Sequence, residues 1–214
     1  MTQLKTSMPG AAERIGPVAW GPVVYVVDED VRARESMELL VDGEGWRTET
    51  FASPEDFSSR SRTTIPCCLL LDASPASLEL QKQLAPRTDI PIIFITGHSD
   101  IPTTVRAMKA GAFDFLTKPL EVDVLRSVIR DAIERSSEMQ SLRTCYASLS
   151  PREREVMRLV VSGLLNKQVA AELGISEITV KAHRGQAMRK MNAASFADLV
   201  TMAARLGVRP VTAH

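Results

Sequence analysis

The sequence predicts an α/β doubly wound, five-stranded parallel sheet followed by a small all-α domain. Short apolar runs alternate with helical patterns over residues 23–135, which is typical of a parallel sheet covered by helices on both faces. Beyond about residue 136 only helical patterns follow. Charge divides at a similar place. Residues 150–214 carry ten Lys or Arg and five Asp or Glu, whereas residues 1–149 carry 16 Lys or Arg and 21 Asp or Glu. A basic end on an acidic body favours a polyanion-binding module joined to a separate domain.

Five short segments are the candidate strands of the sheet. Three of them, 23–27, 67–71 and 92–95, are apolar runs rich in Val, Ile, Leu and Cys, as buried parallel strands are, whereas 47–51 is mostly polar and could be a strand. The expected strands are 23–27, 47–51, 67–71, 92–95 and 114–116. Because crossovers between parallel strands are right-handed, few strand orders are available, and we consider the order 2-1-3-4-5.

Helical patterns separate these strands, and several have recognisable ends. Ser53 can cap a short helix that has Pro54 at its first position, and Gly111 can end the helix before the fifth strand. The expected helices of this part are 31–42, a short one from Pro54, 78–84, 101–110 and 121–134. Strands and helices together make five βα units, and we assign them to one domain over residues 22–138.

The C-terminal part consists of predicted helices alone. Residues 139–149 continue the last helix of the sheet domain as a polar linker helix with a sparse apolar seam. Ser150 can cap the next helix, Pro151 suits its first position, and Glu153 completes a capping box. The expected helices are 151–162, 166–173, 176–191 and 195–206. They form a domain over residues 150–214.

Composition excludes several other classes of protein. The three cysteines are odd in number and lack the spacing of a disulfide framework or a zinc site. No apolar stretch approaches the roughly 18 residues that a membrane-spanning helix needs. The first 20 residues lack the continuous apolar segment of a signal peptide. We therefore expect a cytoplasmic chain that does not enter a membrane, with residues 1–21 as a flexible arm.

Polar side chains follow four of the predicted strands, where ligands bind to open parallel sheets. Asp28 and Glu29 follow the first strand, Asp72 the third, Thr96 the fourth and Lys118 the fifth. Carboxylates gathered in one cleft repel each other and call for a hard cation such as Mg²⁺, which keeps waters and phosphate oxygens as further ligands. With a lysine and a hydroxyl for the phosphate, this set would stabilise phosphoryl transfer onto a carboxylate. Asp72, alone at the end of the central strand, is the expected acceptor.

These residues resemble the receiver domains of bacterial response regulators. That family carries an acidic pair after strand 1, an Asp after strand 3, a Thr or Ser after strand 4 and Lys-Pro after strand 5. Here they are Asp28-Glu29, Asp72, Thr96 and Lys118-Pro119, and residues 95–119 look particularly like the FixJ subgroup. The resemblance covers about residues 22–140. It implies a sensor histidine kinase as phosphoryl donor, bound Mg²⁺, Phe115 as a switch residue, and a Lys118–Pro119 bond that is often cis.

The chain departs from the family pattern in two places. Glu29 stands where the family more often has Asp, so a longer side chain must reach the metal. The loop after Asp72 is about three residues shorter than in relatives, and the resemblance makes Ser74 the candidate to lend a backbone carbonyl to the metal. Both departures keep an alternative open, in which a pseudo-receiver acts without phosphorylation in a constitutively dimeric protein.

Residues 166–191 have the spacing of a helix-turn-helix, with the turn at residues 174–176. At about 100° per residue, one side of the second helix is apolar and suited to packing on a core. On the opposite side we expect base-edge contacts or close approach to the groove from Lys181, Ala182, Gly185, Gln186 and Arg189. On the flanks we expect phosphate contacts from Thr179, His183, Arg184 and Lys190. The alternative is a structural helix pair with a solvated basic face.

The motifs of this part resemble the LuxR-type DNA-binding domain. They are Leu-Ser-Pro-Arg-Glu-Arg-Glu-Val from residue 149, Gly-Leu-Leu-Asn-Lys-Gln-Val-Ala from residue 163, and Leu-Gly-Ile-Ser-Glu-Ile-Thr-Val-Lys-Ala-His-Arg from residue 173. The resemblance covers about residues 145–208. It implies binding to double-stranded promoter DNA at a two-fold site, a homodimer in the active state, and RNA polymerase as a further candidate partner.

The two resemblances together predict a transcriptional response regulator of the FixJ/NarL type, and not an enzyme. Phosphorylation of Asp72 is expected to promote dimerisation and promoter binding. An aspartyl-phosphate phosphatase or mutase on the same sheet architecture is the enzyme alternative. Such enzymes usually carry a second Asp two residues after the nucleophile, and this chain has Ser74 there.

Overall fold

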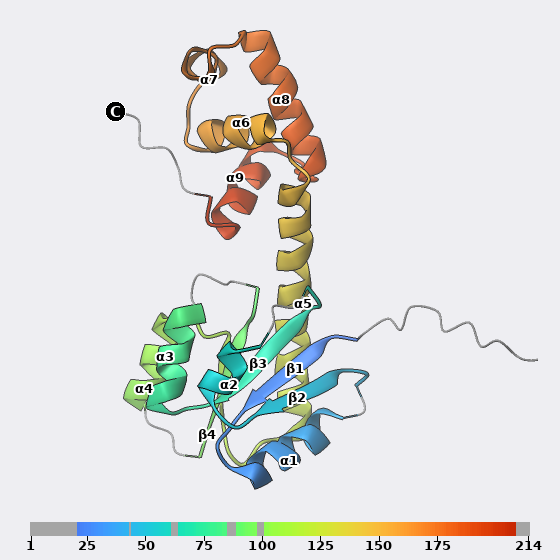
Figure 1. The fold of residues 1–214 in the computed structure, drawn as a ribbon, viewed down its shortest axis with the longest axis vertical. Coiled ribbons are helices and arrows are strands. Elements are labelled where there is room, and N and C mark those ends of the chain that lie inside the picture. The colour runs from blue at the N-terminus through green and yellow to red at the C-terminus, as the bar shows by residue number, and fades with distance from the viewer. Residues whose placement is uncertain (1–20, 43, 61–63, 85–88, 98–100, 209–214) are drawn as a thin grey trace, which may run out of the picture.

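Five parallel strands form one sheet in the order β2-β1-β3-β4-β5, as considered from the sequence (Figure 1). The computed structural model describes residues 21–42, 44–60, 64–84, 89–97 and 101–208. Residues 1–20 of the expected flexible arm lie outside them. The strands are β1 (Val23–Val27), β2 (Arg47–Phe51), β3 (Cys67–Asp72), β4 (Ile92–Thr96) and β5 (Asp114–Thr117).

Helices cover both faces of the sheet because alternate strand residues point to opposite faces. Tyr25 and Leu69 belong to a core with side chains of α2, α3 and α4, whereas Val26 and Leu70 belong to a second core with α1 and α5. The helices are α1 (Val31–Val41), α2 (Pro54–Ser58), α3 (Pro75–Leu84), α4 (Ile101–Lys109) and α5 (Val122–Ala147). The central strands are therefore apolar up to their carboxyl ends, where Asp72 and Thr96 follow, as the sequence predicts.

Helix α3 begins three residues earlier than the predicted start at Leu78, so that boundary was wrong. Ser74 acts as the cap: its Oγ accepts a hydrogen bond from the amide of Ser77 at 3.2 Å, and its carbonyl accepts one from the amide of Leu78 at 3.1 Å. Pro75 occupies the first helical position, which it suits because it has no amide hydrogen to satisfy there. Helix α3 therefore begins within three residues of Asp72.

Helix α5 is continuous from the sheet into the C-terminal helices (Figure 1). The Ser136 hydroxyl donates to the carbonyl of Asp89 at 2.7 Å and accepts from the amide of Cys67 at 3.1 Å, which ties the middle of the helix to the sheet. Within the same stretch, Met139 and Leu142 are buried in the core of the C-terminal helices. The last helix of the sheet and the predicted linker helix are one element.

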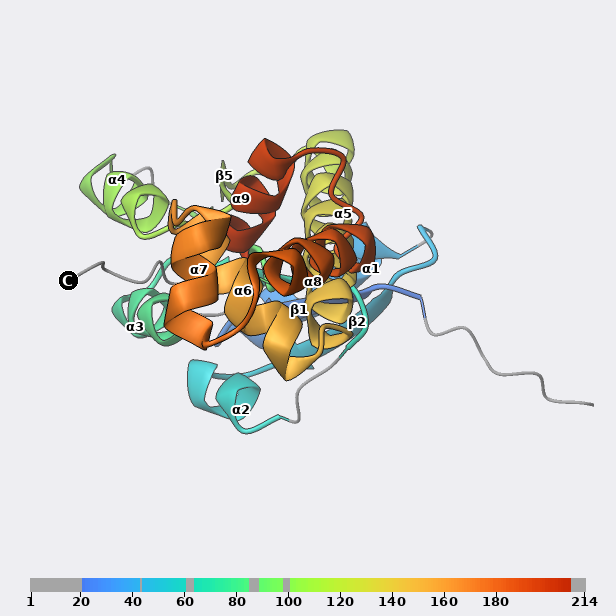
Figure 2. The same cartoon turned by 90° about the horizontal axis from the view of Figure 1, so that it is seen from above.

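Four further helices follow in the described residues up to 208, close to their predicted positions (Figure 2). The Ser150–Glu153 capping box forms at the start of α6, and Gly174 makes the turn between α7 and α8 with a φ of 64°. Glycine tolerates this left-handed conformation because it has no Cβ. The helices are α6 (Pro151–Val161), α7 (Asn166–Leu173), α8 (Glu177–Lys190) and α9 (Phe196–Arg205).

The cysteines are unpaired, as expected. Cys67 and Cys68 are buried in the sheet, and burial raises the pKa of the Cys68 thiol far above its usual range. Cys145 lies partly exposed on α5. Over the part of the chain that the structure describes, no helix combines the length and the apolar character that crossing a bilayer would require.

Candidate functional site

The polar residues predicted to share a cleft lie at the same edge of the sheet. Val27 pairs with Leu71 across β1 and β3, so Asp28 and Asp72 follow the strands side by side. Asp72 in turn pairs with Ile95, next to Thr96, which is buried at the end of β4. The parallel register thus brings the ends of β1, β3 and β4 together, as expected from sequence.

Lys118 reaches the same edge from the fifth strand. Its amide donates to the carbonyl of Thr96 at 2.7 Å, which fixes the start of the loop after β5. The Lys118–Pro119 bond is cis, as the resemblance implies. The ammonium group lies 3.5 Å from the Oδ2 of Asp28, whose side chain is largely shielded from solvent, whereas Lys118 is exposed. A positive charge therefore stands beside the carboxylates, where a phosphate oxygen would need one.

The environment of Asp72 disfavours its charged form. Burial raises the pKa of this carboxyl above its usual range, and the carboxylate of Asp28 raises it further, with a smaller contribution from Glu29. Lys118 and the amide of Ala73 act in the opposite direction. The net direction is upward, so burial and repulsion among the carboxylates together exceed the stabilisation from the one lysine. A bound cation would relieve this repulsion.

The donor set suits Mg²⁺ without forming a complete cage. Within the described residues, no three Asp, Glu, His or Cys side chains are gathered as a ready-made metal site. Asp28 and, to a smaller extent, Glu29 both act electrostatically on Asp72, and Glu29 is exposed. Two oxygen-bearing side chains are enough for Mg²⁺, which commonly completes its octahedron with water and phosphate oxygens. The residues present therefore fit the ion, with Asp28 and Asp72 as the central pair.

The connection after Asp72 is tightly hydrogen-bonded. The amide of Ala73 donates to the carbonyl of Ile95 at 3.0 Å, and the amide of Ser74 donates to the carbonyl of Asp72 at 2.9 Å. The Ser74 carbonyl, expected as a metal ligand, is the acceptor for the first hydrogen bond of α3. A carbonyl oxygen has two lone pairs, so one is left for a metal. Ser74 of the short loop therefore serves as the N-cap of α3.

Phe115, the expected switch residue, is half-buried on β5. Its ring stacks against Phe94 with centroids 6.2 Å apart and planes inclined by 29°. It also packs on the core formed with α2, α3 and α4. The aromatic side chain is therefore in contact with the interior of the sheet domain in this structure.

Helix α8 has a buried apolar face and an exposed face, as predicted. Val180 and Ala187 are fully buried in the two cores of the C-terminal helices. The five residues expected at base edges are all exposed on the other side of the helix: Lys181, Ala182, Gly185, Gln186 and Arg189. The Ser176 hydroxyl caps the helix by accepting from the amide of Thr179 at 3.1 Å. The helix presents a continuous free face to a partner.

Three of the four residues expected to contact phosphates have side-chain partners within the chain. The ammonium of Lys190 lies 2.6 Å from a carboxylate oxygen of the buried Glu153, which joins α8 to the capping box of α6. The hydrogen bond from Lys190, and next the one from the amide of Ser150, lower the pKa of Glu153. The guanidinium of Arg184 lies over the ring of Phe196 at 4.5 Å. The Thr179 hydroxyl lies 2.8 Å from the hydroxyl of Ser176, and both Thr179 and His183 are partly exposed.

Ile178 was not among the residues singled out from sequence. It is 80% exposed in the first turn of α8, although isoleucine is usually buried. Its position, four residues before Ala182, was the signal that could have found it, because residues at that spacing share a helix face.

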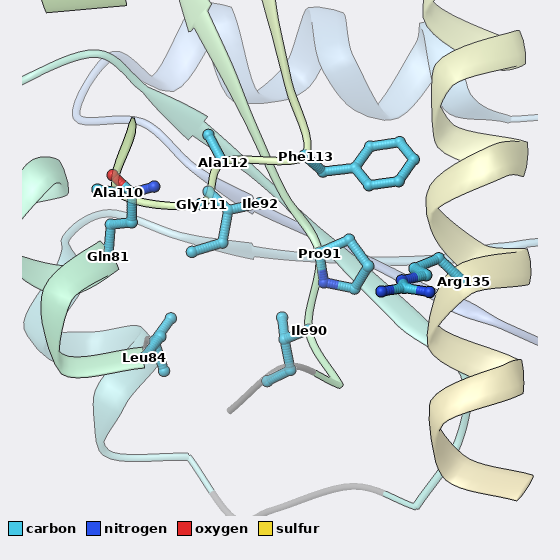
Figure 3. A pocket seen from close by; sticks show the side chains of 10 residues that line it. All are labelled: Gln81, Leu84, Ile90, Pro91, Ile92, Ala110, Gly111, Ala112, Phe113 and Arg135. Atoms are coloured by element: carbon cyan, nitrogen blue, oxygen red, sulfur yellow. The ribbon is translucent and has the colours of Figure 1, made fainter. Parts of the chain in front are cut away.

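A separate hollow of about 350 Å³ lies at the opposite edge of the sheet (Figure 3). It is bordered by the end of α3, the start of β4, the turn before β5, and Arg135 of α5. Gln81 donates from its amide to the carbonyl of Ala107 at 2.9 Å in its wall. None of the residues predicted for the acidic cleft lines it, so this hollow is distinct from the candidate phosphoacceptor site.

Two families match the chain. Residues 24–130 match the family described as "Response regulator receiver domain", and residues 147–203 match "Bacterial regulatory proteins, luxR family". The first covers the sheet and most of its helices, including the acidic cleft. The second covers the helix-turn-helix and its exposed face.

Several relatives match along nearly their whole length. Nodulation protein W from Bradyrhizobium diazoefficiens is 44% identical over 197 residues, which cover 87% of each chain. The response regulator protein TmoT from Ectopseudomonas mendocina is 42% identical over 86% of this chain and 89% of its own. The solved structure of the response regulator StyR is 42% identical, covers 86% of this chain and 99% of its own, and superposes with a TM-score of 0.52.

Proposed function

Because this chain belongs to the response regulators that join a receiver domain to a LuxR-type DNA-binding domain, we propose that it is a phosphorylation-controlled member of that family. Asp72 accepts a phosphoryl group from a sensor histidine kinase. The phosphorylated chain dimerises and binds a two-fold promoter site, where RNA polymerase is its further partner. The observation that carries the proposal is the convergence of Asp28, Asp72, Thr96 and Lys118 at one edge of the sheet.

Each residue of the cleft has a separate role in phosphoryl transfer. A carboxylate oxygen of Asp72 attacks the phosphorus, and the bond from phosphorus to the donor histidine breaks. Lys118 provides a positive charge for a phosphoryl oxygen, and Thr96 provides a hydroxyl donor. Bound Mg²⁺ supplies charge neutralisation for the carboxylates and the phosphoryl oxygens. Asp28 lies 3.5 Å from the Lys118 ammonium and so keeps this group in the cleft.

The switch follows from the new charge on Asp72. A phosphoryl oxygen attracts the Thr96 hydroxyl, and the space that Thr96 vacates favours the inward position of Phe115, whose ring already stacks on Phe94. The face formed by α4 and β5 then becomes the dimer surface. Two copies of α8 are placed for two half-sites, with Lys181, Gln186 and Arg189 toward the bases.

Intact-mass spectrometry tests the phosphoacceptor. Wild type and Asp72→Asn are incubated with Mg²⁺ and acetyl phosphate, and we expect one phosphoryl group on wild type only. Dimerisation by analytical ultracentrifugation should follow the same pattern. Equal dimerisation and DNA affinity of the two proteins under these conditions would contradict the proposal.

One observation favours the second candidate function, a receiver that works without phosphate. The Ser74 carbonyl, the expected backbone ligand of the metal, is already the acceptor for the first hydrogen bond of α3, which leaves only one of its two lone pairs for a cation. This second candidate predicts no phosphoryl gain, and a dimer that binds DNA without a phosphodonor. The same mass and sedimentation measurements therefore separate the two candidates.

A further inference from the structure

An apolar strip runs along the exposed face of α8. Ile178, Ala182 and Gly185 are all exposed, and they follow one another at spacings of four and three residues, so they share one line of the helix. The exposed fraction of Ile178 is larger than that of any other large hydrophobic side chain among the described residues. The buried residues of α8, Val180 and Ala187, lie on the opposite side. The strip contributes nothing to the core of the domain.

Gly185 is not required by the fold. Glycine in the interior of a helix destabilises it by about 0.5–1 kcal/mol relative to alanine. A Cβ added at this position would meet no atom within 4 Å, so packing does not forbid a side chain. Gly185 therefore weakens the helix although the fold does not need a glycine there. The missing side chain would allow a partner to approach the backbone of α8 closely.

The surroundings of the strip specify the kind of partner. Helix α8 carries four Lys or Arg and one Glu, and Lys181, Gln186 and Arg189 border the strip. A partner that is negatively charged overall, yet offers apolar groups at its recognised surface, satisfies both features. In the major groove of DNA, the 5-methyl group of thymine is the apolar group that base edges present.

We propose that the strip formed by Ile178, Ala182 and Gly185 reads thymine methyl groups in the major groove. This inference rests on the proposed function, in which α8 binds DNA. Ile178 contacts a methyl group directly, and the missing side chain of Gly185 lets the helix lie close enough for that contact. Helix-turn-helix proteins place the first residues of this helix at base edges, and Ile178 is the second residue of α8. This end of α8 points away from the sheet domain (Figure 1).

Uracil substitution removes only the methyl group and therefore tests the proposal. Duplexes that bind the full-length chain are first selected from a random library in the presence of Mg²⁺ and acetyl phosphate. Each thymine of the selected duplex is then replaced by deoxyuridine, and the Kd is measured by fluorescence anisotropy. We expect at least one replacement to weaken wild-type binding roughly fourfold, the effect of removing one buried methyl group.

The same duplexes are then measured with two variants that remove an exposed aliphatic side chain. Ile178→Ala should bind the thymine and uracil duplexes equally at that position. The control variant is Leu39→Ala, because the wild-type Leu39 side chain is 77% exposed on α1, far from the proposed strip in sequence. This control should keep the wild-type ratio between the Kd values for the uracil and thymine duplexes. Both variants should melt within a few degrees of wild type, because surface substitutions seldom change stability by more than about 0.5 kcal/mol.

Two results would overturn the inference alone. In the first, no uracil replacement changes the Kd of the wild-type chain. In the second, Ile178→Ala keeps the fourfold difference in Kd between the thymine and uracil duplexes. Both leave sequence-selective DNA binding intact. Failure to enrich any duplex would overturn the proposed function together with the inference. Strong selection with no uracil effect would direct attention to a protein partner for the strip.

Discussion

The acidic cleft and the exposed face of α8 hold their functional side chains in opposite ways. In the cleft, Asp72 is partly buried beside Asp28, and burial first and the Asp28 carboxylate second raise its pKa. On α8, the side chains of the free face are exposed and have little part in the core. A site of the first kind couples function to stability, whereas one of the second kind can change its specificity while the fold is conserved. Four substitutions test this contrast, from the largest expected effect to the smallest.

Met191→Ala should give the largest loss of stability, because this residue at the end of α8 is 1% exposed and packs in the core with α5 and α9. Comparable truncations of buried methionine or leucine cost about 2–5 kcal/mol. Chemical denaturation of the C-terminal helices measures the change. A loss as small as that of Ile178→Ala would mean that α8 does not separate a structural face from a free one.

Glu153→Gln should destabilise the C-terminal helices by about 1–2 kcal/mol at neutral pH, since it weakens a helix cap and removes the charge that pairs with Lys190. The lowered pKa of Glu153 means that the wild-type contribution is present above the ordinary carboxyl pKa, and is lost as pH falls through the folded-state pKa.

Thermal melts of the two proteins between neutral and acidic pH check this prediction. The difference between wild type and Glu153→Gln should shrink toward low pH. A difference that stays constant would show that the charge of Glu153 is not involved.

Gly185→Ala should raise stability by about 0.5–1 kcal/mol, because alanine favours the helix and its Cβ enters open space. The same change should weaken DNA binding by filling the gap between backbone and groove. Denaturation and anisotropy on one preparation measure the two effects together. Tighter binding by the more stable variant would show that the glycine has no role in recognition.

Asp72→Asn should raise the melting temperature slightly in the absence of divalent cations. The raised pKa of Asp72 means that the folded state holds its proton more tightly than the unfolded state does. Stability therefore falls as pH rises from the ordinary carboxyl pKa to the folded-state value, and at neutral pH the charge is unfavourable. Added Mg²⁺ should stabilise wild type more than the variant, which scanning calorimetry would detect. Equal shifts in both proteins would show that Asp72 does not bind the cation.

Most of the fold was predictable from the sequence, because buried strands and helix ends have local signals. The five candidate segments became the five strands, and the Ser150–Glu153 capping box formed as expected. The start of α3 was missed, since Ser74 and Pro75 suit a loop as well as a helix cap until the amide of Leu78 is seen to bond back.

The candidate sites, too, were predictable only where the signal is local or follows from the order of the strands. Parallel strands place their ends at one edge, so the meeting of Asp28 with Lys118 could be expected from residue order alone. Partners supplied by distant segments could not: helical spacing puts Lys190 on a flank of α8, but nothing local pairs it with Glu153, 37 residues earlier. The same holds for Arg184 over Phe196.

The continuity of α5 has a consequence for how the length of this chain can vary. Ser136, Gln140 and Arg143 bond to the sheet domain, while Met139 and Leu142 pack on the C-terminal helices. The two sets alternate along the same turns on different sides of the helix, so no neutral segment separates them. One inserted residue would rotate the remainder of the helix by about 100° and advance it by about 1.5 Å. Relatives with this arrangement should therefore tolerate insertions in loops but keep the helical phase between these contacts fixed.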